Sequence, residues 1–298
     1  MRILLVAGGW SSEREISLTG AQKIKEAMEK LGYEATLWDL TPDYDHFLKL
    51  AKGHDFVFLN LHGLPGEDGS LQALLDHFHI PYQGSGPLGS YLALNKALSK
   101  QIFKSHNLLT PPWTLYKTSM SSCSYPGPFP LVIKPNLGGS SIDLTIIQEE
   151  NDLKQLSLNP EVEYLIEEYV EGIELTCGVL DKEALPPVLI RPKKSFFFDY
   201  KSKYEQNGAE EICPAPIEPE LTQKLQETAL QVHKLLGLKD YSRTDFIYTK
   251  DKKLYILEVN TLPGMTPTSL LPQEALAIGL DFPDLIKKLI ELGLKKKN

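Results

Sequence analysis

Two carboxylates in the last fifth of the chain stand where they could hold a metal ion. Segments in which polar and apolar residues alternate flank the charged turn 250–253, a pattern typical of a β-hairpin. If the chain folds back symmetrically about this turn, Asp245 faces Glu258 and Arg243 faces Asn260. Like charges directly opposite on a sheet are destabilising, and a divalent cation between them would turn that cost into binding energy.

The chemistry of these side chains favours magnesium, because carboxylates with an added amide are hard oxygen ligands. The alternative is a solvated acidic face that Arg243 merely neutralises. The two-residue period of a strand places the apolar side chains of the hairpin on its other face, which we expect to be buried. These side chains are Phe246, Tyr248, Tyr255, Leu257 and Val259.

A second candidate site surrounds the glycine- and serine-rich stretch 135–141. Lys134 ends an apolar strand beside it, and could contact phosphate oxygens while backbone N–H groups cradle the rest. Lys100 is a candidate for a second phosphate contact, and the alternative for both residues is an ordinary surface lysine. The expected elements around the stretch are strands, 130–134 and 142–147, whereas Walker and dinucleotide-binding loops need a helix behind the glycines.

Two further segments could complete a nucleotide site. The acidic stretch 167–174 could hydrogen-bond an adenine amino group and a ribose, or could be a solvated strand end. Residues 193–214 form an aromatic, charged and glycine-containing segment that is long for a loop in a compact domain. We expect this segment to act as a lid.

The elements that position these residues predict an α/β (α+β) fold. Strands 2–7, 34–38 and 56–60, with a helix over 17–31, read as the opening of a doubly wound parallel sheet. We expect three units: an N-terminal Rossmann-like substrate domain (1–86), a central unit with the phosphate loop (87–170), and a C-terminal unit with the lid and the metal site (171–298).

Composition excludes several classes of protein. The chain has 298 residues, of which 42% are hydrophobic and 23% charged, which is ordinary for a globular protein. Its formal net charge of -8 argues against binding to nucleic acid or to an anionic membrane, because such proteins need clustered positive charge. Three scattered cysteines predict neither disulfides nor zinc, and with no targeting or membrane-spanning segment we expect a cytoplasmic protein.

Taken in order, several stretches resemble one enzyme family over nearly the whole chain. The sequence is similar to ATP-grasp enzymes, and within that superfamily to the D-alanine–D-alanine ligases of bacterial wall synthesis. The matching stretches are Gly8 to Ser17, Leu61-His62-Gly63, Gly66-Glu67-Asp68-Gly69, Ile133-Lys134-Pro135, Gly139-Ser140-Ser141, Phe198 to Tyr204, Arg243-Thr244-Asp245 and Leu257 to Leu270.

The resemblance implies a role for individual residues. For ATP, the phosphate contacts would be Lys100 and Lys134 with Ser141, the adenine contacts Glu167 and Val170, and the ribose contact Glu174. The metal ligands would be Asp245, Glu258 and Asn260. The catalytic group would comprise Glu13, which binds the first D-alanine's ammonium, and Ser140, Tyr204, Arg243 and Gly264. Substrate contacts would be His62, Lys203, Ser269 and Leu270.

The same resemblance implies the reaction. ATP would convert one D-alanine to an acyl phosphate, which a second D-alanine attacks to give D-alanyl-D-alanine, ADP and phosphate for peptidoglycan precursor synthesis. Mg²⁺, expected as two ions that Mn²⁺ can replace, would serve as cofactor, and the enzyme would be a homodimer.

One position departs from the family pattern. The phosphate loop of the family continues after Ser141 with an apolar residue and a glycine, whereas this chain has Ile142 and then Asp143. An acid there lacks the conformational freedom of glycine and could bring negative charge towards ATP. If Asp143 points towards ATP, the chain could be a weak ligase or a nucleotide binder without catalysis. A separate alternative keeps the fold and takes D-serine or D-lactate as acceptor. A dinucleotide-dependent dehydrogenase ranks last, because residues 8–11 lack the three-glycine spacing.

Overall fold

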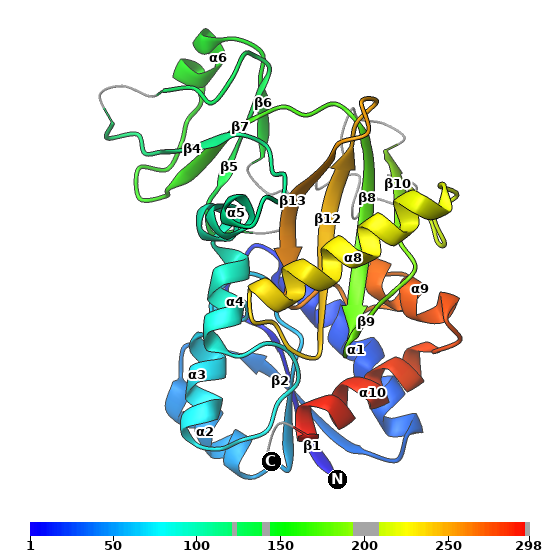
Figure 1. The fold of residues 1–298 in the computed structure, drawn as a ribbon. Helices are drawn as coiled ribbons and strands as arrows, with labels where there is room; N and C mark the ends of the chain where they lie inside the picture. The colour runs from blue at the N-terminus through cyan, green and yellow to red at the C-terminus, as the bar shows by residue number, and fades with distance from the viewer. Residues whose placement is uncertain (121–123, 139–143, 193–208, 296–298) are drawn as a thin grey trace.

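The N-terminal part of the chain is a parallel sheet covered by helices. The computed structural model describes residues 1–120, 124–138, 144–192 and 209–295 (Figure 1). The first sheet has the order β2-β1-β3, and both strand pairs are parallel, as the doubly wound prediction requires. Its elements are β1 (Arg2–Gly8), α1 (Arg14–Lys30), β2 (Glu34–Leu40), α2 (Tyr44–Lys52), β3 (Phe56–Leu59) and α3 (Ser70–His77).

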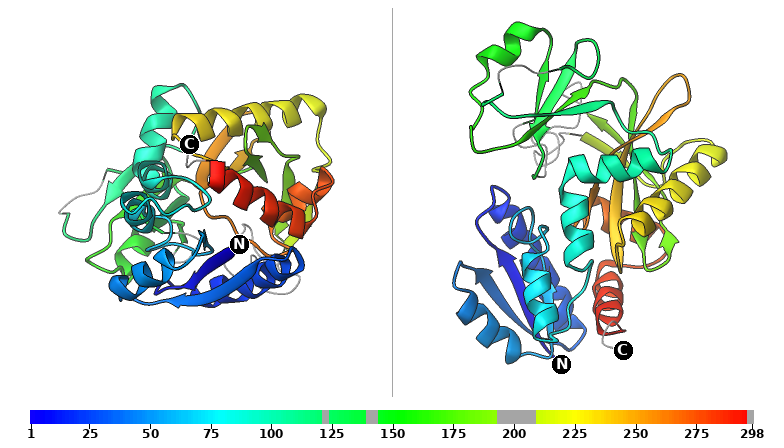
Figure 2. Two further views of the ribbon diagram at one scale, coloured as in Figure 1. Left: turned by 90° about the horizontal axis from the view of Figure 1, so that it is seen from below. Right: turned by 60° about the vertical axis from the view of Figure 1, so that its left-hand side comes forward.

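Two helices lead from this sheet to a small antiparallel sheet at the opposite end of the molecule (Figures 1 and 2). The small sheet has the order β4-β7-β5-β6. Because β5 pairs antiparallel with β6, the glycine-rich stretch joins two strands, which confirms the predicted strand-loop-strand arrangement. The elements are α4 (Pro87–Leu94), α5 (Lys96–Ser105), β4 (Trp113–Tyr116), β5 (Leu131–Pro135), β6 (Thr145–Ile147), α6 (Glu150–Gln155) and β7 (Tyr164–Glu168).

The third sheet carries the predicted hairpin. Its strands follow the order β11-β10-β8-β12-β13, with β9 paired to β8, and α8 packs its apolar side against one face through residues such as Leu225 and Val232. The elements are β8 (Ile173–Leu180), β9 (Glu183–Ala184), β10 (Val188–Pro192), β11 (Ala209–Ile212), α8 (Pro219–Leu235), β12 (Tyr241–Tyr248), β13 (Leu254–Asn260) and α9 (Leu270–Ala277).

The last helix, α10 (Phe282–Lys295), returns to the beginning of the chain. Its buried residues Leu285, Ile286 and Leu289 belong to the same core cluster as the strand β1, and α10 packs against α1 and β3. The two ends of the polypeptide thus share one hydrophobic core. The unit boundaries at residues 86 and 170 stay a prediction.

The hairpin has the predicted register at its acidic end and a different one near its turn. Arg243 pairs with Asn260 and Asp245 with Glu258, but the register shifts between Asp245 and Phe246. This bulge places one extra residue on β13, so that side chains beyond it exchange faces. The expected burial of Tyr255 and Leu257 is therefore wrong: both are only half-buried, and the core side chains of this strand are Leu254, Ile256 and Val259.

None of the helices within the described ranges is long and apolar enough to span a membrane.

Candidate active site

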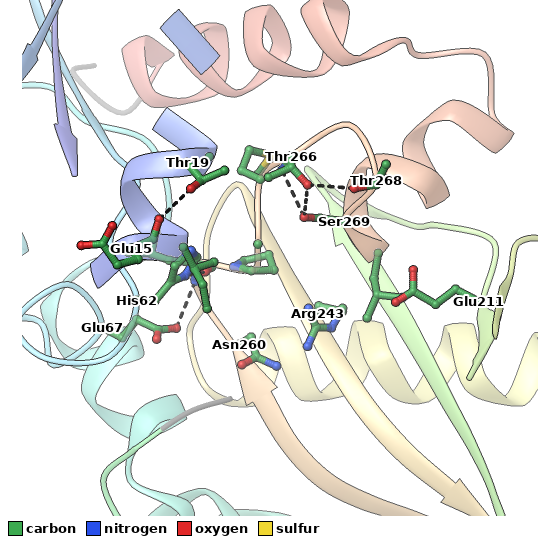
Figure 3. A pocket seen from close by; sticks show the side chains of 17 residues that line it. Glu15, Thr19, His62, Glu67, Glu211, Arg243, Asn260, Thr266, Thr268 and Ser269 are labelled. Atoms are coloured by element: carbon green, nitrogen blue, oxygen red, sulfur yellow. Dashed lines mark hydrogen bonds between the residues drawn. The ribbon is translucent and has the colours of Figure 1, made fainter. Parts of the chain in front are cut away.

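A pocket of about 430 Å³ lies where the N-terminal unit meets the end of the hairpin. Its walls come from α1, from the loop after β3, and from the segment that follows β13 (Figure 3). In the close-up, His62 and Glu67 approach from the N-terminal side while Arg243 and Asn260 lie on the strands of the third sheet. Six residues predicted for the site line this pocket: His62, Arg243, Asn260, Gly264, Ser269 and Leu270.

At the base of the pocket, Asp245 is held by three neighbours. Arg243 donates from Nε and Nη2 to its two carboxylate oxygens over 2.8 and 2.9 Å. Thr176 donates its hydroxyl to Oδ1 over 2.6 Å, and the amide of Asn260 donates to Oδ2 over 3.1 Å. Burial opposes the charge of Arg243, but the carboxylate of Asp245 outweighs it and raises the guanidinium pKa above its ordinary value. Since Asp245 is buried, the alternative of a solvated acidic face is wrong here.

Glu258 has a cationic neighbour that the sequence reasoning missed. Lys96 places its Nζ 3.6 Å from Glu258 Oε2 and donates a hydrogen bond to the carbonyl of Gly138, at the start of the phosphate loop. Lys96 is itself buried. A signal for it was present, because Lys96 precedes Lys100 by one helical turn and therefore shares a face of α5 with it.

The chemistry of Asp245, Glu258 and Asn260 fits a divalent cation. They offer two carboxylates and an amide on adjacent strands, which are the hard oxygen donors that Mg²⁺ takes. Within the described part of the chain, no three His, Cys, Asp or Glu side chains converge on one point. A cation here would therefore complete its shell with the Asn260 amide, water and oxygens of a phosphate, as is usual for Mg²⁺.

The two predicted phosphate lysines converge on Glu167, which comes from β7. Lys100 Nζ lies 2.8 Å from Oε1 and Lys134 Nζ lies 2.9 Å from Oε2, and Lys100 also donates to the hydroxyl of Thr110 over 2.6 Å. Both lysines are buried, so the alternative of surface lysines is wrong. Burial lowers the pKa of Lys100 to about 8 against the attraction of Glu167. Burial would raise the pKa of Glu167, but the two ammonium groups outweigh it and hold that pKa below its usual range.

The other predicted nucleotide contacts lie where the chain passes from the small sheet to the third sheet. Val170 and Glu174 are half-buried. Val170 lies in the connection after β7, which ends at Glu168. Glu174 lies in β8 between Ile190 and Ile247. Five positions lie outside the described residues: Ser140, Ser141, Asp143, Lys203 and Tyr204.

Glu13 lies just before α1 and is buried near His62. Burial lowers the pKa of His62, and the negative charge of Glu13 opposes that effect. Gly63, the residue after His62, has φ of +64°, and a Cβ added to it would lie 3.6 Å from Glu13 Oε2. A side chain at Gly63 would be strained by this backbone conformation.

Glu67 is, after Lys96, a second residue of the site whose role was not predicted from the sequence. Its carboxylate accepts the N–H of Gly63 over 2.8 Å and the N–H of Leu262 over 3.3 Å. His62 Nδ1 lies 3.1 Å from the Leu262 carbonyl. Because a carbonyl only accepts, Nδ1 carries the proton. The peptide groups of Leu262 are thus held on both sides by the loop after β3, which fixes the N-terminal unit to the end of the hairpin.

Comparison with known proteins agrees with this arrangement. Residues 106–291 match the family model described as D-ala D-ala ligase C-terminus. The chain is 52% identical over 298 residues to the D-alanine–D-alanine ligase of Nitratidesulfovibrio vulgaris (strain DP4), covering 99% of this chain and 98% of the relative.

Solved structures give the same result. The crystal structure of D-alanine–D-alanine ligase from Bacillus anthracis complexed with ATP matches with a TM-score of 0.87 and 34% identity, over 100% of this chain and 98% of that one. The VanG D-Ala:D-Ser ligase from Enterococcus faecalis matches with a TM-score of 0.81 and 26% identity, over 98% and 99% of the two chains. The predicted ATP-grasp fold is confirmed, and this chain belongs to the D-alanine–D-alanine ligase family.

Proposed function

We propose that the chain joins two D-alanine molecules through an acyl phosphate, giving D-alanyl-D-alanine, ADP and phosphate for peptidoglycan precursors. The observation that carries this proposal is the pocket in which His62, Arg243 and Ser269 meet. It combines a polar side at His62, which has the carboxylate of Glu13 as a neighbour and is suited to an ammonium, with a cationic side at Arg243, suited to a carboxylate.

The nucleotide would lie between the small sheet and the third sheet. Lys100 and Lys134, with Ser141 of the phosphate loop, would contact the phosphates. Glu167 and Val170 would hold the adenine and Glu174 the ribose. Support comes from the convergence of the two lysines on one carboxylate, because Glu167 holds the two ammonium groups close together and favours their charged form.

Asp245, Glu258 and Asn260 would hold Mg²⁺, expected as two ions that Mn²⁺ can replace. The ions would offset charge on the phosphates of ATP during phosphoryl transfer. Arg243, held rigidly by Asp245, would present its remaining guanidinium surface to the pocket. A preorganised cation of this kind stabilises developing negative charge without moving.

The first D-alanine would place its ammonium at Glu13, with His62 nearby. Its carboxylate oxygen attacks the γ-phosphorus of ATP, the bond from that phosphorus to the β-phosphate oxygen breaks, and ADP leaves. This step makes the carboxyl carbon reactive, because a free carboxylate resists attack by an amine. Glu13 and His62 orient the donor so that the attacking oxygen points towards the phosphate.

The second D-alanine would place its carboxylate at Ser269 and Leu270, at the start of α9. Its ammonium gives up one proton to solvent, the free amine attacks the acyl carbon, and the nitrogen passes its second proton to the departing phosphate. Arg243 with the backbone of Gly264 steadies the tetrahedral oxyanion. The carbon–oxygen bond to the phosphate then breaks, and inorganic phosphate leaves. Ser140, Lys203 and Tyr204 would complete the catalytic group and keep water away from the acyl phosphate.

The enzyme would work in the cytoplasm as a homodimer. ATP as a substrate and a composition without a disulfide framework support that compartment. The dimer follows only from the family resemblance, and light scattering of the purified protein tests it directly.

The reaction itself is tested by product analysis. Incubation with ATP, Mg²⁺ and D-alanine should yield the dipeptide and ADP in equal amounts, and AMP as the nucleotide product would contradict the proposal. Equimolar D-serine or D-lactate tests the acceptor, and D-alanyl-D-alanine should remain the main product. If nucleotide stabilises the protein thermally while no D-amino acid is turned over, the chain is a nucleotide binder without catalysis.

A further inference from the structure

A carboxyl group that the mechanism does not use lies behind Arg243. Glu274 in α9 is fully buried. Its Oε1 accepts the N–H of Gly178 over 2.8 Å, whereas its Oε2 has no hydrogen-bond partner among the described residues. A buried carboxyl group with one oxygen that lacks a hydrogen bond reduces the stability of the fold, so its presence at this position needs an explanation.

Gly178 places this carboxyl on the reactive face of the third sheet. In the ladder between β8 and β12, Gly178 stands directly opposite Arg243, and residues that stand opposite each other in a sheet point their side chains to the same face. A Cβ on Gly178 would lie only 2.4 Å from Glu274 Oε2. The carboxyl of Glu274 therefore fills the space that a side chain at position 178 would take, beside Arg243.

Glu274 also belongs to the helix that starts at the acceptor site. Ser269 caps α9 and Leu270 is its first residue, while Glu274 follows Leu270 by four residues and thus lies one turn further on the same face. Arg243 and Ser269 line the same pocket. A hydrogen bond from β8 to Glu274 accordingly fixes the distance between the start of α9 and the strand next to Arg243.

We propose that Glu274 is a positioning residue that holds the start of α9 against β8, so that the acceptor carboxylate is received at a set distance from Arg243. The inference rests on the proposed function, because Ser269 and Leu270 matter only if an acceptor binds there. It predicts that Glu274 affects the binding of the second D-alanine and leaves the first D-alanine and ATP unaffected.

The neutral form of the side chain suits this role. Burial raises the pKa of Glu274 to about 8, against the opposing effects of the Gly178 N–H and the charge of Arg243. At pH 7 the group is therefore mostly a neutral acid, which accepts a hydrogen bond without adding a second negative charge beside Arg243. That arginine already pairs with Asp245.

The alternative is that Glu274 only stabilises the fold. On the edge of β8 that faces away from β12, β10 pairs with residues up to Thr176, and β9 pairs with residues from Val179 onwards. Gly178 lies between these two ladders, so its N–H needs an acceptor from outside them. If this were the whole role, loss of Glu274 would lower stability without separating the two D-alanine sites. The test must therefore separate the Michaelis constants of those sites.

The experiment compares Glu274→Gln and Glu274→Met in the full chain. Glutamine keeps an acceptor and stays neutral, whereas methionine keeps the volume and removes the acceptor. The rate at varied D-alanine, fitted to sequential binding of two molecules, gives a Michaelis constant for each site. We expect E274Q to stay within about twofold of wild type, and E274M to raise the second-site constant about tenfold or more. The first-site constant and the KM for ATP should not change.

The control is Leu276→Ala, a change at an exposed side chain of the same helix, which should leave every constant unchanged. Equal changes at both D-alanine sites in E274M, or none at either, would overturn the inference. If E274M does not fold, Gly178→Ala replaces it, because the added Cβ would lie 2.4 Å from Glu274 Oε2 and displace that carboxyl. A second-site constant raised alone in G178A supports the inference, and equal changes at both sites or none at either overturn it. A wild-type protein that makes no dipeptide would instead refute the proposed function.

Discussion

Asp245 and Glu258 stand directly opposite each other on β12 and β13, and the ladder shifts register immediately after Asp245. The repulsion between the two carboxylates is reduced, because Arg243 pairs with Asp245 and Lys96 lies near Glu258. The bulge turns the outer half of the hairpin so that its apolar side chains meet α8, while the acidic pair keeps facing the pocket side of the sheet. The extra residue of the bulge thus lets the apolar side chains reach the core while the two carboxylates stay at the site.

Replacing Glu258 by glutamine should abolish turnover with little loss of fold. The change keeps size and removes the charge that a metal ligand needs, so we expect ADP release to fall at least about a hundredfold. The unfolding free energy, measured in urea, should change by only about 1 kcal/mol, because the side chain is at the edge of the core. Glu34→Gln, at an exposed carboxyl in β2, is the control. An E258Q protein with normal turnover would show that this face is not the metal site.

Replacing Glu167 by glutamine should destabilise the protein before any nucleotide is added. Two buried ammonium groups, those of Lys100 and Lys134, would lose their shared counter-charge. Breaking a buried ion pair on one side costs about 3 kcal/mol or more, so urea unfolding should show a loss of that order. The neighbouring change Glu168→Gln serves as a control and should cost less than about 1 kcal/mol. Equal stability of E167Q and E168Q would contradict the bridge.

The free energy of unfolding should depend on pH through the carboxyl group of Glu67. Burial raises the pKa of this carboxyl from 4.5 to about 7 in the folded protein. A raised pKa means that the stability contributed by the protonated form is complete below about pH 4.5 and is lost as pH rises through about 7. Relative to E67Q, the wild-type unfolding free energy should therefore fall between pH 5 and 8, on the order of 3 kcal/mol.

Denaturant unfolding of both proteins across that pH range measures this difference. Glu34→Gln, at an exposed carboxyl, is the matched control and should follow the wild-type curve. If wild type and E67Q run parallel from pH 5 to 8, the carboxyl of Glu67 is not perturbed by burial and does not hold the Leu262 peptide as described.

The acidic pair and the lysines were accessible from the sequence because their signals are local. Alternation in two segments around one turn was enough to pair Asp245 with Glu258. The bulge was not predictable, since it depends on which of Ile256 and Leu257 packs better against α8. Glu167 was predicted as an adenine contact, and its position between two lysines from α5 and β5 follows only from the tertiary fold.

Two helices were not predicted from the sequence, and one of them, α9, lies at the site. In α9, the acidic Glu274 is buried while the apolar Leu276 is exposed, so no amphipathic period marks the helix. In α2, a capping Asp43 that accepts the His46 N–H was available as a signal. No sequence motif marks Glu274, because its hydrogen-bond partner is the backbone N–H of Gly178. That N–H is left without a strand partner by the gap between two ladders, which only the tertiary fold creates.

The most direct test of the central claim follows an oxygen atom. D-alanine labelled with ¹⁸O in its carboxyl group is incubated with ATP, Mg²⁺ and the enzyme, and the products are analysed by mass spectrometry. Through an acyl phosphate, each dipeptide formed leaves one ¹⁸O in the inorganic phosphate, with unlabelled ADP beside it. Phosphate without the label, or label in AMP, would contradict activation of the donor carboxylate by the γ-phosphoryl group.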